Sequence, residues 1–296
     1  MKAIEIVLSY NCNASCGFCF VPPPVRGYGF THEMSRGILA NGRANGAETV
    51  LFGGGEPTIC KELLALILYA KKTGYETINI KTNGMIYCYP DHARRAIKAG
   101  ANLFTIPIWG PAELHDRYAC VPGAFERTEM AIKNLLDYGA NVEIDLLVTK
   151  SNMESLAGSV ERFAAVGVRH FSLWYLSLFG MEEAGADMAW ELPRYKEALP
   201  FMREAMEAGK KAGSELIRTS HVPPCLMADI PEHYAIIKDM DLLIVTPGNS
   251  FKGEESPFER GVYIEACEGC CLQERCLGIR EDYLRVHGAA EFSAVK

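Results

Sequence analysis

The sequence predicts an α/β protein whose main part is an open or partial barrel of six parallel β/α units, a (β/α)6 arrangement. Over the first 176 residues, short runs rich in β-branched residues alternate with stretches of helical periodicity. Recurring strand-then-helix units favour a parallel sheet covered by helices. Because a closed barrel of this kind has eight units, we expect the sheet to stay open on one side.

Six segments have the composition of strands and are bounded by turn residues. In chain order they are residues 3–10, 48–52, 77–81, 103–108, 142–148 and 170–174. The stretches between them place apolar residues on one helical face, and they end at glycines that can close a helix: Gly74, Gly139 and Gly167. Ser151 and Glu154 have capping-box spacing, which predicts a helix start after the fifth strand.

The β/α rhythm stops after Trp174, and the rest of the chain alternates short apolar runs with proline pairs and cysteines. A helix is expected over residues 192–213, kinked or interrupted at Pro200. We therefore predict a barrel over residues 1–185 and a C-terminal extension over residues 186–296.

The composition excludes several classes of protein. The 296 residues are 49% hydrophobic and 23% charged, which is ordinary for a globular chain. Thirty Lys and Arg against 37 Asp and Glu give a net charge of −7 without a basic block, so we expect no nucleic-acid partner. The longest apolar run, residues 63–70, is too short for a bilayer span and the start has no signal-peptide layout, so we expect a cytoplasmic protein with no membrane contact.

Three cysteines follow the first predicted strand with the spacing C-x3-C-x2-C: Cys12, Cys16 and Cys19. Clustered thiols in a reducing compartment more often bind metal than form disulfides, and an odd total of eleven cysteines cannot pair completely. Three thiolates can hold one cubane iron–sulfur cluster and leave one iron open for a substrate. A closed zinc site needs a fourth ligand nearby, but His32 lies beyond the proline turn at residues 22–24.

This motif resembles the signature of the radical S-adenosylmethionine (SAM) superfamily, including the aromatic residue before the last cysteine, here Phe18. The resemblance implies that the three cysteines ligate a [4Fe-4S] cluster whose open iron binds SAM. It also implies an external one-electron donor such as flavodoxin or ferredoxin, and cleavage of SAM to a 5′-deoxyadenosyl radical. Phe18 and Phe20 would lie beside the adenine. The alternatives are a structural zinc loop and incidental thiols that bind nothing.

A glycine-rich turn follows the second predicted strand and ends in Gly54-Gly55-Glu56. Consecutive glycines let backbone groups approach a ligand, and Glu56 offers acceptors to an ammonium group. The turn resembles the GGE motif of the same superfamily, which implies that Gly54, Gly55 and Glu56 bind the amino group of SAM. The alternative is a plain glycine turn before a helix.

Polar or aromatic residues also follow the third, fourth and sixth predicted strands. The resemblance implies that Thr82 and Asn83 contact the ribose or carboxylate of SAM, although a plain Asn-Gly turn fits equally well. Trp109 stands where relatives often carry Ser or Asp, which is a departure from the family. Tyr175 is either part of an adenine wall or a core aromatic.

The fifth predicted strand carries Glu143 and Asp145 out of phase with its apolar residues. If the apolar set faces the helices, both carboxylates point into the barrel; otherwise they face solvent. We favour the inward orientation for at least one of them.

Three more cysteines, Cys267, Cys270 and Cys276, form a C-x2-C-x5-C motif near the C-terminus. The motif resembles the core of SPASM and Twitch domains, which implies a Twitch-like segment with an auxiliary [4Fe-4S] cluster. Cys225 is the candidate fourth ligand, with Cys271 as the alternate.

Full SPASM domains carry a further cysteine where this chain has Arg280, so one auxiliary cluster is expected rather than two. Zinc is the rival occupant, because four thiolates suit it equally. Either metal would stabilise a segment that is poor in apolar residues.

The remaining thiols and histidines are expected to be structural. Cys60, Cys88 and Cys120 are single cysteines, which are usually small buried hydrophobes, although a lone thiol can also return a hydrogen to a substrate radical. His115, next to Asp116, and His221 have no partner motif in the sequence.

These resemblances together imply an enzyme that removes a hydrogen from a peptide or small-metabolite substrate, with the auxiliary cluster assisting oxidation or bond formation. A cyclase of the molybdenum-cofactor type is an alternative, although the basic tail expected for a triphosphate is not evident. A non-catalytic zinc-binding interaction module is another. Because no residues remain before the first strand for a leader-peptide-binding domain, a peptide-modifying enzyme of this length would need a separate recognition protein.

Overall fold

The computed structural model describes residues 1–181, 184–235, 240–259 and 261–296. Within these residues one sheet contains nine strands: β1 (Ala3–Ser9), β2 (Thr49–Gly54), β3 (Thr77–Lys81), β4 (Leu103–Ile108), β5 (Asn141–Val148), β6 (His170–Tyr175), β7 (Leu216–Ser220), β8 (Leu242–Val245) and β9 (Ser250–Lys252). The first six confirm the six predicted strands, with ends that differ by at most two residues.

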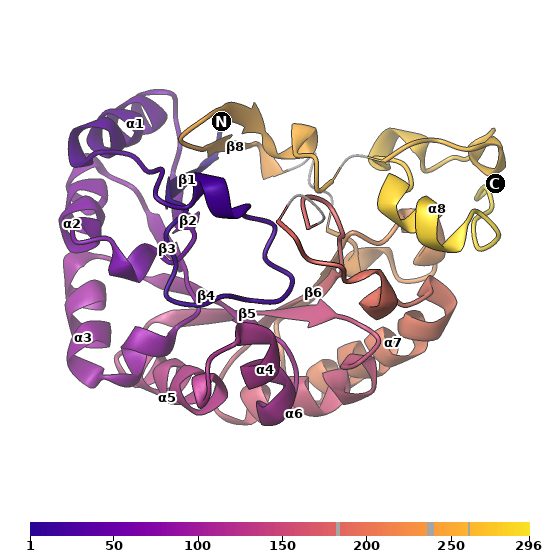
Figure 1. Cartoon of the computed structure of the whole chain (residues 1–296), viewed down its shortest axis with the longest axis horizontal. Coiled ribbons are helices and arrows are strands. Elements are labelled where there is room, and N and C mark those ends of the chain that lie inside the picture. The colour runs from indigo at the N-terminus through magenta and orange to yellow at the C-terminus, as the bar shows by residue number, and fades with distance from the viewer. Residues whose placement is uncertain (182–183, 236–239, 260) are drawn as a thin grey trace.

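The strand order is β7-β6-β5-β4-β3-β2-β1-β8-β9. Neighbours pair in parallel, apart from the antiparallel pair of β8 and β9. Since β7 and β9 stand at opposite ends of this order, the sheet is open, and the predicted α/β fold with a partial barrel is confirmed. Figure 1 shows the sheet with its helices along the outer side.

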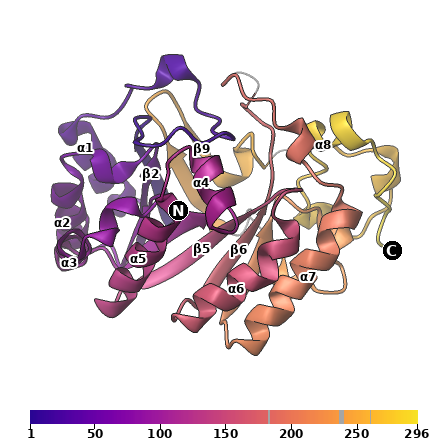
Figure 2. The same ribbon diagram turned by 60° about the horizontal axis from the view of Figure 1, so that its bottom comes forward.

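The main helices are α1 (His32–Ala44), α2 (Leu63–Thr73), α3 (Pro90–Ala99), α4 (Ala112–Ala119), α5 (Ala124–Asp137), α6 (Leu156–Ala165), α7 (Tyr195–Lys211) and α8 (Glu281–His287). Figure 2 shows α5, α6 and α7 side by side against one face of the sheet. The strands turn buried apolar side chains to the core, such as Ile6, Phe52 and Phe104. Because side chains alternate along a strand, burial of these residues fixes which other residues face the concave inner side of the open sheet. This inner side is here called the inside of the arc.

The expected end of the β/α rhythm at Trp174 is wrong. α7 and β7 form a further β/α unit, and β7 pairs in parallel with β6. β7 reads LIRTS, so its apolar run is only two residues long before Arg218, which is too short to predict a strand. α7 also continues through Pro200. The division of the chain near residue 185 stays a prediction.

The predicted capping box at Ser151 and Glu154 is also wrong. α6 begins at Leu156, and the Ser151 hydroxyl donates a hydrogen bond to Glu191 instead. Among the described residues, no helix combines the length and the apolar character needed to cross a membrane.

Candidate active site

The segment between β1 and α1 (residues 10–31), here called the Cys loop, carries Cys12, Cys16 and Cys19 beyond the C-terminal end of β1. Figure 1 shows it in indigo, running across the inside of the sheet. Burial, and then the thiols of Cys12, Cys19 and Cys120, raises the pKa of Cys16 to about 12. The structure therefore brings the three predicted thiols together, with Cys120 beside them.

The glycines of the GGE turn lie against the backbone of the Cys loop. A Cβ on Gly54, whose φ is +121°, would lie 2.3 Å from the Ser9 carbonyl oxygen, and a Cβ on Gly55 would lie 2.0 Å from that of Asn11. The N–H of Gly55 donates to Ser9 at 2.8 Å, and the N–H of Glu56 donates to Asn11 at 2.8 Å. The close neighbour of these glycines is thus the chain itself, and their missing side chains let the Cys loop dock on the end of β2.

Glu56 is buried, and both of its carboxylate oxygens are engaged. Oε1 accepts from the Thr58 N–H at 3.0 Å, the Thr58 hydroxyl at 2.6 Å and the Thr82 hydroxyl at 2.7 Å. Oε2 accepts from the Asn83 N–H at 2.8 Å. Burial raises the pKa of Glu56, and these hydrogen bonds oppose the shift. The structure therefore joins the predicted residues at the ends of β2 and β3 in one network.

Asn83 connects this network to the Cys loop. Its side-chain Nδ2 donates to Oδ1 of Asn13 at 2.8 Å, and its carbonyl accepts from the Thr128 hydroxyl at 3.0 Å. Gly84 follows in a left-handed conformation with a φ of +79°, so the Asn-Gly turn is present as well. Asn83 thus both forms a turn and holds the Cys loop.

The aromatic residues of the motif have different surroundings. Phe18 is buried and packs edge-on against Trp109, with ring centroids 4.5 Å apart, and against Tyr118 at 5.4 Å. Trp109, the departure from the family pattern, is thus the packing partner of Phe18. Phe20 is 45% exposed and packs against Phe258 at 4.5 Å. A place for either ring beside adenine stays a prediction.

Tyr175 is not placed as part of an adenine wall. Its side chain is fully buried, its ring stacks on Tyr195 with centroids 4.2 Å apart, and its hydroxyl donates to the carbonyl of Pro193. With no exposed face, Tyr175 is a core aromatic in this structure, and the adenine expectation is corrected.

Charged side chains occupy the inside of the arc. The Ser172 hydroxyl donates to Glu143 at 2.8 Å, and Arg218 lies 3.7 Å from the same carboxylate. Across the sheet, Lys81 forms an ion pair with Glu5 at 3.0 Å. The predicted inward orientation of the fifth-strand carboxylates is therefore confirmed.

Asp145 lies beside this set. Burial, and then the Glu143 carboxylate, raises the pKa of Asp145 to about 7, while Lys81 and Arg218 oppose the shift. The inside of the arc thus holds carboxylates and cations together, and one of the carboxylates can change charge near neutral pH.

The C-terminal cysteines meet in a second place. Cys225, Cys267, Cys270 and Cys276 line one small pocket, whereas Cys271 is exposed and is not part of its lining. Burial, and then the three other thiols, raises the pKa of Cys225 to about 11. Of the two candidates for a fourth ligand, the geometry therefore favours Cys225.

One backbone amide points to each of two of these thiols. The N–H of Gly278 lies 3.2 Å from the Cys276 sulfur, and that of Val295 lies 3.4 Å from the Cys270 sulfur. Hydrogen bonds of this kind stabilise a thiolate and tune the potential of an iron–sulfur cluster. The chain around the pocket thus suits anionic sulfur.

In the described parts of the chain, no three His, Cys, Asp or Glu side chains converge tightly enough to hold a single metal ion. Ligands of one zinc ion each lie about 2.3 Å from it when they are thiolates. Neither cysteine set is therefore arranged around a single ion in the described structure.

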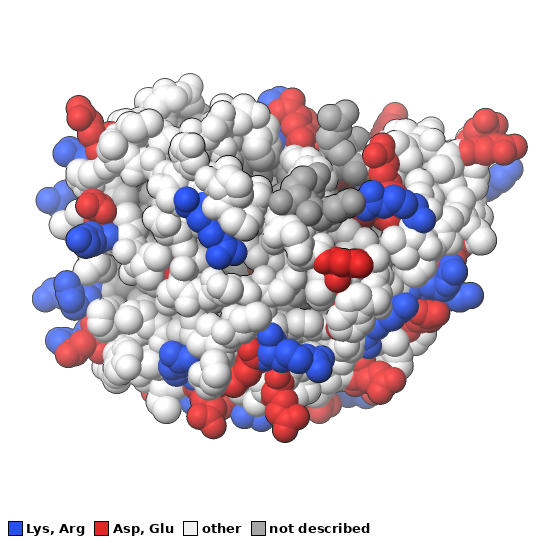
Figure 3. Space-filling view, viewed as in Figure 1, with Lys and Arg blue, Asp and Glu red and all other residues white. Residues whose placement is uncertain are grey.

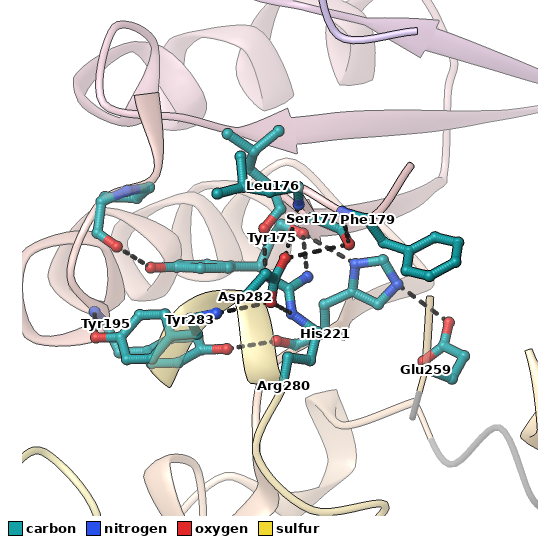
Figure 4. A network of polar contacts seen from close by, with 12 residues as sticks. Tyr175, Leu176, Ser177, Phe179, Tyr195, His221, Glu259, Arg280, Asp282 and Tyr283 are labelled. Carbon is teal, nitrogen blue, oxygen red and sulfur yellow. Dashed lines mark hydrogen bonds and ion pairs between the residues drawn. The ribbon is translucent and has the colours of Figure 1, made fainter. Parts of the chain in front are cut away.

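Arg280 holds the C-terminal segment against the end of β6. Its guanidinium donates to the Leu176 carbonyl at 2.5 Å and forms an ion pair with Asp282 at 3.2 Å. Asp282 in turn accepts from the Leu178 N–H at 2.7 Å. Figure 4 shows these side chains side by side at the end of β6. The residue that replaces a SPASM cysteine thus anchors the segment to the barrel.

The expected structural histidines are confirmed. Both ring nitrogens of His221 are engaged, Nδ1 with the Tyr175 carbonyl at 3.0 Å and Nε2 with Glu259 at 3.1 Å (Figure 4). His115 is buried, accepts from the Trp109 N–H at 3.2 Å, and has its pKa lowered to about 4 by burial. With both nitrogens engaged, the His221 ring leaves neither of them poised for a substrate in the way a general base would.

The single cysteines differ from the expectation. Cys60 and Cys88 are partly exposed, and Cys120 is exposed at the end of α4 with a left-handed φ of +54°. The expectation that each is a buried small hydrophobe is therefore wrong, most clearly for Cys120.

Four residues that the sequence did not single out complete the surroundings of the Cys loop: Asn11, Asn13, Tyr118 and Glu191. Asn13 lies within the cysteine motif, so its side-chain amide was a usable signal, whereas Asn11 comes directly before the motif and contributes its backbone carbonyl. Tyr118 and Glu191 come from distant segments, and no spacing in the sequence indicates that they meet.

Comparisons with known proteins agree with this geometry. The family model described as "Radical SAM superfamily" matches residues 6–163, which is more than half of the chain. An AdoMet-dependent heme synthase of Nitratidesulfovibrio vulgaris is 27% identical over 201 residues, 67% of this chain and 54% of that protein. A probable GTP 3′,8-cyclase of Saccharolobus solfataricus is 27% identical over 246 residues, 79% of this chain and 75% of that protein. The chain thus spans about half the length of the heme synthase.

Solved structures share the fold. SuiB of Streptococcus suis, bound to the precursor peptide SuiA, aligns with a TM-score of 0.71 at 16% identity over 99% of this chain and 75% of that chain. Native anSMEcpe with bound AdoMet aligns with a TM-score of 0.68 at 14% identity over 99% and 93%. The family match agrees with the three thiols that lie on one loop beside a buried GGE carboxylate. We conclude that the chain is an enzyme of the radical SAM superfamily.

Proposed function

We propose that Cys12, Cys16 and Cys19 hold a [4Fe-4S] cluster with one open iron, and that Glu56 holds the amino group of SAM at that iron. The observation that carries the proposal is the docking of the Cys loop on the GGE turn, through the hydrogen bond from the Glu56 N–H to Asn11. When bound, the cluster would supply the electron that cleaves SAM to a 5′-deoxyadenosyl radical.

The chain's own groups have three tasks in this proposal. The thiols converge from one short loop, so they are suited to a single cluster rather than to separate ions. Hydrogen bonds from Thr82 and Asn83 fix the Glu56 carboxylate, and an ammonium group binds best to a carboxylate that is already oriented. Phe18 packs the loop into the core.

We further propose an auxiliary [4Fe-4S] cluster on Cys225, Cys267, Cys270 and Cys276, in a Twitch-like segment. The shared pocket and the amide hydrogen bonds to sulfur support this assignment. Zinc is the rival occupant, and metal analysis distinguishes the two.

The substrate class follows from the charges inside the arc and on the surface. Among the described inward residues, Lys81 pairs with Glu5 and Arg218 pairs with Glu143, so these two cations leave no surplus of positive charge for a triphosphate. Figure 3 shows the face that carries the Cys loop; it is mostly white, with a few single charges of both signs near its middle and more of them around the rim. We propose a peptide or small-metabolite substrate rather than GTP.

The partners follow from the chemistry. An external one-electron donor such as flavodoxin or ferredoxin would reduce the cluster. A cytoplasmic location is proposed because a reducing compartment keeps the thiols available for metal.

Anaerobically reconstituted protein, reduced and supplied with SAM, should release 5′-deoxyadenosine. Cys16→Ala should abolish this product, whereas Cys60→Ala, which changes a thiol outside both cysteine sets, should preserve it. A wild-type protein that takes up iron and still yields no 5′-deoxyadenosine would refute the proposal.

A further inference from the structure

A buried carboxylate from a distant segment lies behind the Cys loop. Glu191 is fully buried, and its side chain accepts hydrogen bonds from the Tyr118 hydroxyl and from both the N–H and the hydroxyl of Ser151, at 3.0 and 2.7 Å. A buried carboxylate is tolerated only when donors surround it, and these three donors meet that need. The Tyr118 hydroxyl is thereby fixed in place.

Tyr118 contacts the Cys loop at two points. Its carbonyl accepts a hydrogen bond from the Gly17 N–H at 2.9 Å, and its ring packs edge-on against Phe18 at 5.4 Å. Gly17 and Phe18 lie between Cys16 and Cys19. The residue bound by Glu191 is therefore also the residue that holds the part of the loop between the second and third thiols.

Glu191 is fixed from the other side by the C-terminal segment. His287 in α8 bonds through Nε2 to the Leu192 carbonyl at 3.0 Å, and the Arg194 guanidinium donates to the His287 carbonyl at 3.2 Å. Tyr195, which follows Arg194, lies beside Tyr283 of α8 in Figure 4. Glu191 thus has a rigid support and does not depend on the Cys loop for its own position.

We propose that Glu191 is a positioning residue for the Cys loop, acting through the Tyr118 hydroxyl to set the spacing of the thiols that receive the iron–sulfur cluster. This inference rests on the proposed function, because it concerns the same cluster. Tyr118→Phe deletes the hydroxyl at almost constant volume. Glu191→Gln keeps the shape but must turn its oxygen to the Ser151 N–H, so its NH2 group faces the Tyr118 hydroxyl and the charged acceptor is lost.

The test compares Tyr118→Phe, Glu191→Gln, the double variant and Tyr75→Phe. Tyr75→Phe is the matched control, because it deletes a buried hydroxyl that donates to the Leu39 carbonyl at 2.9 Å, near the start of β3 rather than at the Cys loop. Alkylation of Cys16 and Cys19 by iodoacetamide in the metal-free protein, followed by peptide mass spectrometry, reports how well the loop is held. The electron paramagnetic resonance spectrum of the reduced, reconstituted protein reports the cluster.

We expect both single variants to alkylate about tenfold faster than the wild type, because a hydrogen bond to a charged group is lost. The double variant should be alkylated no faster than the faster single variant, because both substitutions remove the same hydrogen bond between Tyr118 and Glu191. The resonance spectrum should change in the same way in both singles and stay unchanged in Tyr75→Phe.

The inference would be overturned if Tyr118→Phe is alkylated at the wild-type rate, or if the rate increases of the two single variants multiply in the double variant. The proposed function would stand in either case. If the wild-type protein takes up no cluster, the proposed function fails, and the alkylation rates of the metal-free protein still decide whether Glu191 positions the loop.

Discussion

The backbone N–H of Asn83 donates a hydrogen bond to the buried carboxylate of Glu56 over 2.8 Å. Because the Asn83 side chain also donates to Asn13, this pair joins the ends of β2 and β3 to the loop that carries the three cysteines. The carboxyl ends of parallel strands meet at one edge of the sheet, which is why motifs far apart in the sequence form one site.

We predict that Glu56→Gln lowers the affinity for SAM by about tenfold or more without loss of iron. The amide is neutral, so it attracts an ammonium group less, and its NH2 group cannot accept the hydrogen bonds that Thr82 or Asn83 donates. Equilibrium binding of SAM to the reconstituted protein measures the change. Glu62→Gln, at an exposed carboxylate before α2, serves as the control, and equal affinities in the two variants would refute a role for Glu56.

The iron content should distinguish the candidate fourth ligands. The iron content should fall from about eight irons per chain in the wild type to about four in Cys225→Ser, because Cys225 lines the pocket with the other three thiols. Cys271→Ser should keep the wild-type content, because that thiol is exposed and outside the pocket. The opposite pattern would make Cys271 the ligand, and zinc with only about four irons in the wild type would exclude an auxiliary cluster.

Asp145 should make the folded state less stable as the pH rises. Folding raises its pKa to about 7 from an ordinary value near 4, mainly through burial. The folded state therefore holds the proton more tightly, so this stabilisation is complete below pH 4 and is lost as the pH rises to about 7. Asp145→Asn should be more stable than the wild type at pH 8, by at most about 4 kcal/mol.

Urea unfolding at pH 5 and pH 8 measures this difference. Asp91→Asn, at an exposed carboxylate, is the control and should keep the pH dependence of the wild type. If the free energy of unfolding of Asp145→Asn changes with pH as much as that of the wild type, another group is responsible for the pH dependence.

Loss of Arg280 should detach the C-terminal segment from the barrel. Arg280→Met removes the bonds to the Leu176 carbonyl and leaves Asp282 buried without its cation, which costs about 3 kcal/mol or more. Limited proteolysis should then cut the segment after β7 faster than in the wild type. Arg94→Met, at an exposed ion pair, should change nothing, and equal cleavage in both variants would remove the anchoring role.

Much of the barrel could be predicted from the sequence, because strands buried on their helical face carry strong apolar runs. The six predicted strands and the inward Glu143 follow from that pattern. β7 and β8 were missed because one contains Arg218 and the other has only four residues, Leu242–Val245. Their place in the sheet comes from pairing with β6 and β1, which periodicity does not record.

The site residues could be predicted where they belong to a motif of fixed spacing along the chain. The two cysteine sets and Glu56 have such spacing, and the structure groups each set. Glu191 and the burial of Tyr175 depend on segments that meet only after folding, so a single sequence contains no signal for them.

The central claim is that the three N-terminal thiols leave one iron open for SAM. Electron–nuclear double resonance of the reduced protein with SAM labelled with ¹⁵N at its amino group tests this directly. We predict a ¹⁵N coupling to the cluster that is replaced by a ¹⁴N coupling when unlabelled SAM displaces the labelled molecule. A cluster signal with no such coupling, at SAM concentrations that saturate binding, would contradict the claim.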